Sequence, residues 1–429
     1  MEAPRPYYPP AVPAPVPWSR PEPFGAWVRL DDATLLAVDH GLAARLGVPH
    51  GAAAASAAPL EMHLAVTARC PVGCEGCYVD ARPEGDEPSF EELRARLAEA
   101  AAAGVSTVAF GGGEPMLRRD LGRLAEQARA LGLVPVMTTS GLGLTASRAA
   151  ELRAFAQINV SHDGAGEGYA AVRGVEGAAR AERAIAVLAG AGVPVGVNLV
   201  LTQANFDALG PTAARVADLG AREIQLLRYK PAGRAAGPAY AARKLLPAQV
   251  DRLWPAIGDV VAARRAERRF GVRIDCAMVP LLSASLLAAA PRPAEALQSL
   301  GVFGCEAGRH LGALRADGSA APCSMFSVAP SIPVSPAALP ASLLKPPAST
   351  PAWPRRLPLA PASADAMRAY HAAPPEPCGS CPLFAVCRGG CQVVSRHELG
   401  AFAPDPECPR VVDARRAREG AREGAHEER

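Results

Sequence analysis

The sequence predicts an α/β protein, built as a partial (β/α)6 TIM-like barrel and followed by a cysteine-rich C-terminal domain. Two observations support this fold class. Between Met62 and Arg228, six apolar strand-like segments alternate with amphipathic helical segments, an order typical of a parallel sheet with helices outside it. Right-handed crossovers curl such a sheet into a barrel or part of one. Beyond these units, seven of the eleven cysteines lie between Cys305 and Cys408.

Length and composition set the first limits. A chain of 429 residues exceeds the usual size of one domain. The net charge of +3 is too small to indicate a nucleic-acid or membrane partner. The longest apolar run, near Pro280–Ala290, is too short to cross a membrane, and the N-terminal residues MEAPRPYYPP lack the order of a signal peptide. We therefore expect a cytoplasmic protein whose cysteines are metal ligands in a reducing compartment.

The composition changes along the chain and predicts five segments. These are an N-terminal proline-rich extension with a small cap (1–60), the barrel (61–245), a helical connector (246–300), the cysteine-rich domain (301–410, with a Pro/Ala-rich insertion at 328–377) and a charged tail (411–429). In the cap, Trp27–Leu30 predicts a short strand followed by a helix, and we expect this segment to pack on the main domain. We expect no winged-helix peptide-recognition module in residues 1–60, which are short and rich in proline.

The barrel segment predicts its elements one by one. The expected strands are Met62–Thr67, Val105–Phe110, Val134–Thr139, Ile158–Ser161, Val193–Leu201 and Glu223–Arg228. The first expected helix begins at Ser89, because Ser89 and Glu92 have the spacing of a capping box. The later helices are expected at Arg119–Leu131, Thr145–Phe155, Glu176–Ala191 and Phe206–Leu219.

Two motifs follow the first two strands. Cys70, Cys74 and Cys77 form a C-x3-C-x2-C run, and three thiolates can hold three corners of a cubane iron–sulfur cluster while one iron stays open. Zinc prefers four protein ligands, so a zinc site or a set of core thiols explains this trio less well. Gly112, Gly113 and Glu114 follow the second strand, where glycines let a ligand approach the backbone and a carboxylate can accept from an ammonium. Reactive groups gather at the carboxyl ends of such strands.

Together these motifs resemble the signature of the radical S-adenosylmethionine (radical SAM) enzymes. The resemblance implies that the three cysteines ligate a [4Fe–4S] cluster, that SAM chelates its open iron, and that Gly112-Gly113-Glu114 binds the amino group of SAM. The further SAM contacts that it implies are Tyr78, Ser161, Asp163, Arg173 and Asn198.

The distal cysteines resemble the SPASM extension of peptide-modifying radical SAM enzymes, an iron–sulfur domain with auxiliary [4Fe–4S] clusters. The resemblance implies one cluster on Cys305, Cys323 and Cys391, and a second on Cys378, Cys381, Cys387 and Cys408. The segment Glu306–Pro322 lacks a cysteine that many members carry, so the first of these clusters has only three assigned ligands. Either one iron stays open for substrate or Cys276 supplies the fourth ligand, but the sequence favours a plain buried thiol for Cys276. Zinc also fits cysteines in this ribbon-like spacing.

The resemblance implies an oxidoreductase that cleaves SAM to a 5′-deoxyadenosyl radical and oxidatively crosslinks or matures a peptide or protein. Alternatives are an anaerobic sulfatase-maturing (formylglycine-forming) enzyme, with Asp275 as a speculative base, and an enzyme acting on a small molecule or in a haem pathway. A non-catalytic metal-stabilised binding protein would not need Gly112–Glu114. The expected partners are the peptide or protein substrate, a reductant such as flavodoxin or ferredoxin, and a separate peptide-recognition protein.

Overall fold

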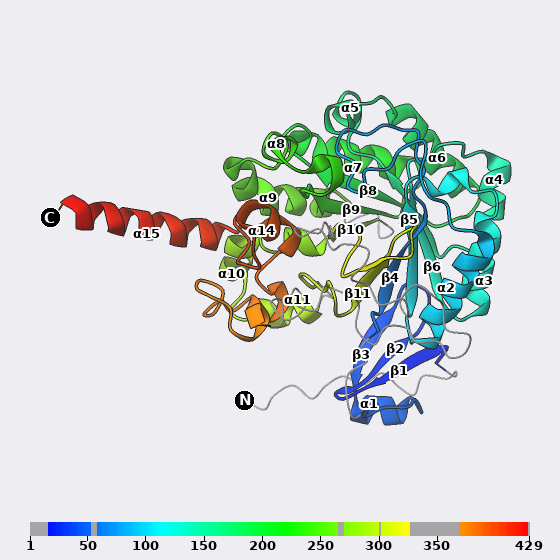
Figure 1. The fold of residues 1–429 in the computed structure, drawn as a ribbon, viewed down its shortest axis with the longest axis horizontal. Coiled ribbons are helices and arrows are strands. Elements are labelled where there is room, and N and C mark those ends of the chain that lie inside the picture. Colours follow the sequence, from blue (N-terminus) through cyan, green and yellow to red (C-terminus); the bar gives the residue numbers. More distant parts are fainter. Residues whose placement is uncertain (1–15, 53–57, 265–269, 300–301, 327–368, 428–429) are drawn as a thin grey trace, which may run out of the picture.

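An open, mostly parallel sheet forms the centre of the molecule (Figure 1). The computed structural model describes residues 16–52, 58–264, 270–299, 302–326 and 369–427. The nine strands of this sheet follow the order β10-β9-β8-β7-β6-β5-β4-β11-β12, and only the β11–β12 pair is antiparallel. They are β4 (Glu61–Thr67), β5 (Thr107–Gly112), β6 (Val134–Thr139), β7 (Gln157–Ser161), β8 (Val195–Leu201), β9 (Glu223–Arg228), β10 (Gly271–Ile274), β11 (Leu311–Leu314) and β12 (Ala320–Ala321).

The six predicted strands are confirmed as β4 to β9, each within two residues of its expected start and end, and they are neighbours in chain order. Side chains alternate between the two faces because successive residues of a strand point in opposite directions. In β4, Met62, Leu64 and Val66 are fully buried, whereas Glu61 and His63 are half-buried and face the inside of the curved sheet. The sheet therefore presents an apolar outer face to the helices and a more polar inner face to a cavity.

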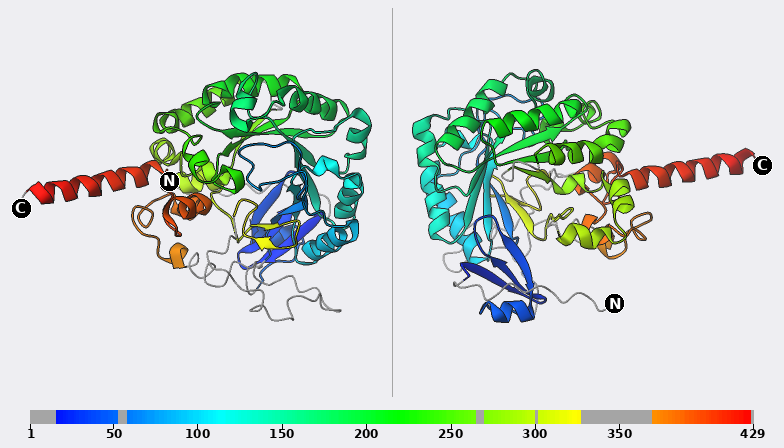
Figure 2. Two further views of the ribbon diagram at one scale, coloured as in Figure 1. Left: turned by 45° about the horizontal axis from the view of Figure 1, so that its top comes forward. Right: turned by 180° about the vertical axis from the view of Figure 1, so that it is seen from behind.

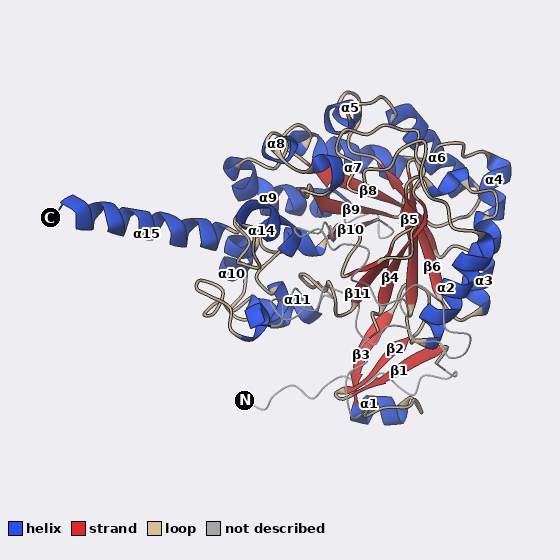
Figure 3. Ribbon diagram, in the orientation of Figure 1, coloured by secondary structure: helices blue, strands red, loops and turns tan. Residues whose placement is uncertain are grey.

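Helices cover the outer face (Figure 3). They are α2 (Phe90–Ala102), α3 (Leu121–Ala130), α4 (Ala146–Glu151), α6 (Ala178–Gly190), α7 (Leu209–Asp218) and α9 (Pro247–Arg264), while the short helices α5 (Gly168–Arg173) and α8 (Pro238–Ala241) lie in the segments that follow β7 and β9. The capping box predicted at Ser89 is present, with the Ser89 side chain bonded to the Glu92 amide and the Glu92 carboxylate to the Ser89 amide. From this start, Leu93, Leu97 and Ala100 recur at helical spacing and are completely buried against the sheet.

The connector expected to be helical contains a strand as well, so that prediction was incomplete. After α9, residues Gly271–Ile274 form β10, which pairs in parallel with β9, before α10 (Ser283–Ala289) and α11 (Pro293–Ser299). A four-residue alternation is too short to identify a strand from sequence, and its pairing partner lies 45 or more residues away. The strands β11 and β12 extend the other edge, where β11 pairs with β4. Among the described residues no pairing joins β10 to β12, so the barrel is partial, as predicted.

The N-terminal cap holds more strand than the sequence predicted. It is a three-stranded antiparallel sheet of β1 (Trp18–Glu22), β2 (Gly25–Arg29) and β3 (Leu35–Asp39), followed by α1 (His40–Arg45). The predicted strand and helix correspond to β2 and α1, but β1 and β3 were missed: β1 contains a proline and β3 has a helix-compatible composition, so only their pairing with β2 makes them strands. The cap packs beneath the central sheet (Figure 1), where buried Arg20 and Arg29 donate to the carbonyls of Gly104 and Ser106 ahead of β5.

The cysteine-rich region ends in three helices, α13 (Phe384–Cys387), α14 (Gln392–Leu399) and α15 (Pro409–Glu427). The predicted charged tail belongs to α15, which projects away from the rest of the molecule in every view (Figure 2). Most of the predicted insertion at 328–377 lies outside the described residues. Within the described part of the chain, no helix combines the length and apolar composition needed to cross a membrane.

Candidate active site

A cavity of about 1460 Å³ lies on the inner face of the sheet and is lined by the loops that follow β4, β5, β7 and β9. Cys70, Cys74 and Cys77 line it, and so do residues 31–35 of the N-terminal cap. Pockets for drug-sized ligands usually measure about 300–1,000 Å³, so this cavity can hold two molecules of moderate size. The cysteine trio and the glycine motif, 35 or more residues apart in sequence, both line this one space.

The cysteine loop follows β4, and hydrogen bonds join its first residues to its last. The Cys70 amide donates to the Arg82 carbonyl over 2.6 Å, and the Ala81 amide donates to the Cys77 sulfur over 3.4 Å. Burial raises the pKa of the Cys70 thiol, and the neighbouring Glu114 carboxylate and Cys77 and Cys74 thiols raise it further. Iron binding must therefore displace a proton from Cys70.

Arginines from distant elements hold this loop in place, and the sequence analysis did not identify the most connected of them. Arg234, just after β9, donates to the carbonyls of Cys74 and Ala81 and to the Asp80 carboxylate, at 2.7–3.0 Å. The preceding Gly233 has a φ of +55°, and a Cβ there would lie 2.4 Å from the Cys77 carbonyl oxygen. The conformation of the cysteine loop thus depends on residues about 160 positions further along the chain.

The glycine loop lies directly against the strand that leads to Cys70. The Gly113 amide donates to the Thr67 carbonyl over 2.7 Å, and the Glu114 amide donates to the Arg69 carbonyl over 2.8 Å. A Cβ on Gly112 would lie 2.3 Å from the Thr67 carbonyl oxygen, and one on Gly113 would lie 2.1 Å from the Arg69 carbonyl oxygen. Both positions therefore require glycine because the two backbones approach so closely.

The Glu114 carboxylate already accepts hydrogen bonds within the protein. It is 1 % exposed and accepts from the Thr139 hydroxyl (2.6 Å), the Ser140 amide and hydroxyl (2.8 and 2.5 Å) and the Met116 amide (3.0 Å). A carboxylate has about four acceptor positions. In this structure Glu114 therefore joins the glycine loop to the end of β6, and an ammonium would have to share or displace these partners.

The remaining residues predicted to contact SAM are an ion pair, Asp163 and Arg173, and three separate side chains that line the cavity. Asp163 and Arg173 form an ion pair at 2.6 Å, and the Arg173 guanidinium reaches the Cys74 sulfur at 3.5 Å. Burial acts to lower the pKa of Arg173, but Asp163 outweighs it and the net shift is upward. Ser161, Asn198 and Tyr78 line the cavity together with this pair. Asp163 also accepts from the Val200 amide, so its carboxylate joins Arg173 to β8.

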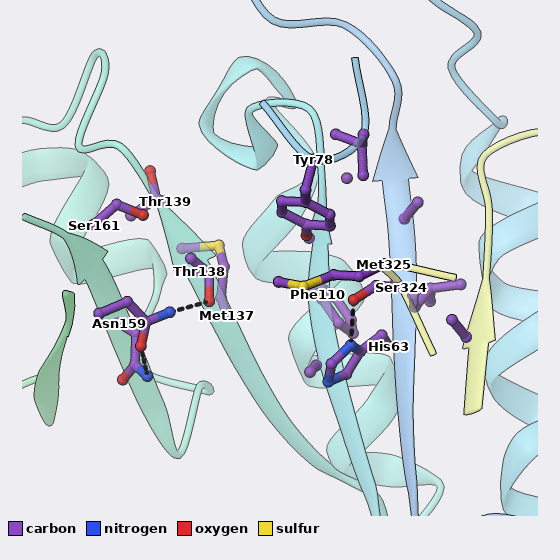
Figure 4. Close-up of a pocket in the computed structure, with 18 of the residues that line it drawn as sticks. His63, Tyr78, Phe110, Met137, Thr138, Thr139, Asn159, Ser161, Ser324 and Met325 are labelled. Carbon is purple, nitrogen blue, oxygen red and sulfur yellow. Dashed lines mark hydrogen bonds between the residues drawn. The ribbon is translucent and has the colours of Figure 1, made fainter. Parts of the chain in front are cut away.

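A belt of polar side chains crosses the inner wall, and of its members the sequence analysis named only Asn198. The Asn159 amide donates to Asn198, which in turn donates to the Thr138 hydroxyl, at 2.9 and 3.3 Å. On the other side of the cavity, His63 hydrogen-bonds to Ser324, a neighbour of Cys323, at 2.9 Å (Figure 4). The sequence pattern that could have identified this belt is the polar residue at alternate positions of otherwise apolar strands.

The cysteine-rich region contains a second group of thiols. Cys378, Cys381, Cys387 and Cys408, predicted to ligate one auxiliary cluster, line one small apolar pocket beside Asp405. Burial raises the pKa of the Cys378 thiol to about 11, although the Tyr370 hydroxyl lowers it, and Cys408 and Cys381 raise it further. Four thiols around one space are the donor set of a [4Fe–4S] cluster.

The third group combines Cys305, Cys323 and Cys391. Burial raises the pKa of Cys323 to about 11, and Cys391 adds to this shift, while Cys305 interacts electrostatically with both. Asp275, the speculative base, forms a buried ion pair with Lys230. Of these two side chains, Lys230 lines the cavity and Asp275 does not.

All eleven cysteines are free thiols. Within the part of the chain that the structure describes, no three His, Cys, Asp or Glu side chains converge closely enough to enclose one metal ion. The assignment of each thiol to a cluster remains a prediction.

Comparison with known proteins agrees with this geometry. Residues 64–209 match the Radical SAM superfamily. The PqqA peptide cyclase of Streptomyces rochei is 38 % identical over 177 residues, which are 39 % of this chain and 48 % of that protein. The PqqA peptide cyclase of Methylocella silvestris is 32 % identical over 180 residues, 39 % of this chain and 47 % of that protein. The chain thus spans about half the length of the curated relatives that it matches.

Solved structures resemble the fold over a larger part of the chain. SuiB of Streptococcus suis bound to S-adenosylmethionine has a TM-score of 0.67 at 16 % identity and covers 91 % of this chain and 98 % of its own. The protein anSMEcpe with bound AdoMet and the Cp18Cys peptide has a TM-score of 0.56 at 17 % identity, covering 82 % and 94 %. The similarity to SuiB therefore extends beyond the barrel into the cysteine-rich region.

Proposed function

Because residues 64–209 form a radical SAM domain, we propose that this protein is a SAM-dependent radical enzyme that oxidatively modifies a peptide. The observation that carries the proposal is the shared cavity. The three thiols and the glycine loop meet at one end of it, and about 1460 Å³ leaves room for a second molecule beyond SAM. Two relatives point to the same substrate class, since the sequence relatives are peptide cyclases and SuiB has been crystallised with the precursor peptide SuiA.

The residues that line the cavity would form two binding sites, one for an iron–sulfur cluster and one for SAM. Cys70, Cys74 and Cys77 would hold a [4Fe–4S] cluster, and the loop from Gly112 to Glu114 would hold the methionine end of SAM. When bound, the cluster and SAM supply one-electron reductive cleavage of SAM, which yields a carbon radical able to abstract hydrogen from the substrate. Auxiliary [4Fe–4S] clusters on the distal cysteines, and an external donor such as flavodoxin or ferredoxin, belong to the same proposal.

The protein's own groups position these components and keep water away. Arg234 and Arg173 fix the cysteine loop from two sides, so the thiols present one geometry to the cluster. Thr139 and Ser140 hold Glu114, which keeps the glycine loop rigid at the cavity wall. The enclosing sheet and helices limit access of solvent, which a reactive radical requires.

The test is anaerobic. We expect the reconstituted chain to form 5′-deoxyadenosine from SAM and dithionite, and a Cys70→Ala/Cys74→Ala/Cys77→Ala variant to form none. If the unaltered chain forms no product, either alone or with candidate precursor peptides whose modification is followed by mass spectrometry, the proposed function is wrong. Recognition of the peptide by a separate protein would appear as modification that depends on that protein.

Anaerobic formylglycine formation, the alternative that the sequence suggested, stays a second candidate, because anSMEcpe, which shares the fold, has been crystallised with AdoMet and the Cp18Cys peptide. The observation against this candidate concerns the residue that would act as its catalytic base. Asp275, which the sequence suggested for this role, is paired with Lys230 and does not line the cavity. Activity on a sulfatase-derived peptide containing Cys or Ser, and its loss in Asp275→Asn but not in Asp259→Asn on the exposed side of α9, would favour this candidate.

A further inference from the structure

His63 projects from β4 into the cavity, on the wall opposite Asn159 (Figure 4). Its neighbours in the sheet are Ala109 on β5 and Ala313 on β11. These small side chains leave space on both sides of the imidazole, and 33 % of the His63 side chain is exposed. The imidazole is therefore accessible to a molecule that is bound in the cavity.

Both ring nitrogens of His63 have partners that define the state of the ring. Nε2 lies 3.1 Å from Oε1 of Glu61, and Nδ1 lies 2.9 Å from the Ser324 hydroxyl oxygen. Partial burial acts to raise the pKa of Glu61, but His63 and Arg273 together outweigh it, so the pKa is lowered and Glu61 is ionised. A carboxylate only accepts hydrogen bonds, so Nε2 carries the hydrogen and Nδ1 accepts from Ser324. A neutral imidazole held in this way can take up a proton through the Ser324 hydroxyl.

Ser324 connects the imidazole to the cysteine-rich region. It lines the cavity and directly follows Cys323 in the chain. The turn that carries it is held by the Phe326 amide, which donates to the Cys323 carbonyl over 3.1 Å, and by Arg315, which donates to the Phe326 carbonyl over 2.6 Å. A hydroxyl that is bonded to His63 and a predicted ligand of an auxiliary cluster therefore belong to adjacent residues at the cavity wall.

We propose that His63 is the proton acceptor of the oxidative step on the peptide, with Glu61 orienting the imidazole and Ser324 passing the proton to it. The inference rests on the proposed function, in which abstraction of a hydrogen atom leaves a carbon radical on the peptide. When this carbon bonds to a second group of the peptide, the second group loses its hydrogen as one proton and one electron. The electron goes to an oxidised auxiliary iron–sulfur cluster. The proton goes through the Ser324 hydroxyl to Nδ1 of His63, giving an imidazolium paired with the Glu61 carboxylate.

The main variant is His63→Gln, because a glutamine can hydrogen-bond to both Glu61 and Ser324 but takes up no proton. A second variant, His63→Ala, leaves a space that added imidazole can fill. The matched control is His50→Ala in the cap, since the His50 side chain lies outside the cavity lining. Each reconstituted chain receives SAM, dithionite and the candidate precursor peptide that the unaltered chain modifies. The rates of formation of 5′-deoxyadenosine and of modified peptide are measured separately.

We expect His63→Gln to form 5′-deoxyadenosine at nearly the unaltered rate but modified peptide about 100-fold more slowly, a usual contribution of general acid–base catalysis. Added imidazole should restore modified peptide in His63→Ala and change nothing in His50→Ala. The inference is overturned if His63→Gln forms modified peptide at the unaltered rate, or if it also loses 5′-deoxyadenosine formation. Failure of imidazole to restore folded His63→Ala overturns it too. If His63→Ala does not fold, His63→Gln decides by itself.

A measurement without turnover tests the state of the ring. NMR spectra of the ring nitrogens in the full chain before reconstitution, with His63 assigned by comparison with His63→Gln, should show a hydrogen on Nε2 and none on Nδ1 at neutral pH. A doubly protonated ring overturns the inference, because it accepts no further proton. The two proposals also fail differently. If the unaltered chain modifies no peptide, both are wrong, whereas modification that does not depend on His63 overturns this inference alone.

Discussion

Replacement of Gly112 by alanine should displace the glycine loop from the strand that leads to Cys70. Gly112 has a φ of +105°, a region that costs other residues about 1–3 kcal/mol. Its Cβ would lie 2.3 Å from the Thr67 carbonyl oxygen, about 1 Å closer than ordinary contact. Forcing a methyl group into such a contact costs about 1–3 kcal/mol more. Because one backbone shift relieves part of both, we expect a loss of about 3 kcal/mol in the free energy of unfolding.

Gly111 supplies the matched control. A Cβ there meets no atom within 4 Å, and the backbone is not in the left-handed region, so Gly111→Ala should be neutral or slightly stabilising. Chemical denaturation of the two apo-proteins measures the difference, and the SAM affinity of the reconstituted proteins measures its effect on the site. If Gly112→Ala is no less stable than Gly111→Ala, the close backbone approach is not what requires glycine at this position.

Three further perturbations test other parts of the structure. Arg234→Ala removes three hydrogen bonds to the cysteine loop, so we expect about 1–3 kcal/mol lower stability and faster iron release, while Arg82→Ala on the exposed side should change little. Asp405→Asn removes a carboxylate that pairs with the buried Arg228 guanidinium. We therefore expect the free energy of unfolding, measured by chemical denaturation, to fall by about 3 kcal/mol or more. Burial raises the pKa of the Cys323 and Cys378 thiols to about 11. Their protonated forms therefore favour the folded apo-protein fully below about pH 9, and we expect the free energy of unfolding to fall as the pH rises from there toward 11.

Each of these three predictions would be contradicted by a specific result. Equal iron release from the Arg234 and Arg82 variants would mean that Arg234 does not hold the loop. An Asp405 variant as stable as the parent would mean that Glu407, the second carboxylate on Arg228, suffices alone. Apo-protein stability that stays constant from pH 9 to 11 would mean that the thiols are not buried in solution. Iron affinity measured over the same range should rise with pH, because the thiols must lose protons to bind.

Local sequence patterns predicted the repeating part of the fold. The capping box at Ser89 and the helical spacing of Leu93 and Leu97 depend on neighbours three to seven residues away, so they can be read without knowing the fold. The strands β4 to β9 were predicted for the same reason, and their order followed from the short, right-handed connections. The catalytic motifs were also local, since each lies within one loop.

Elements that depend on distant partners were missed. β10 and the cap strands β1 and β3 are short, and pairing with a neighbouring strand decides their conformation. The role of Arg234 could not be predicted, because an arginine in a loop looks the same whether it faces solvent or three carbonyl and carboxylate oxygens.

The sequence by itself determined the ligand chemistry, because the number and spacing of Cys70, Cys74 and Cys77 within one loop decide which group they can hold. Only the tertiary structure decided which distant side chains share a site. It brought Arg234 to the cysteine loop, and gave Glu114 partners at the end of β6. The physical reason is that three thiolates of one short loop can bind a cluster through local chain geometry alone. Contacts between distant residues depend instead on strand pairing and on buried ion pairs between segments far apart in the chain.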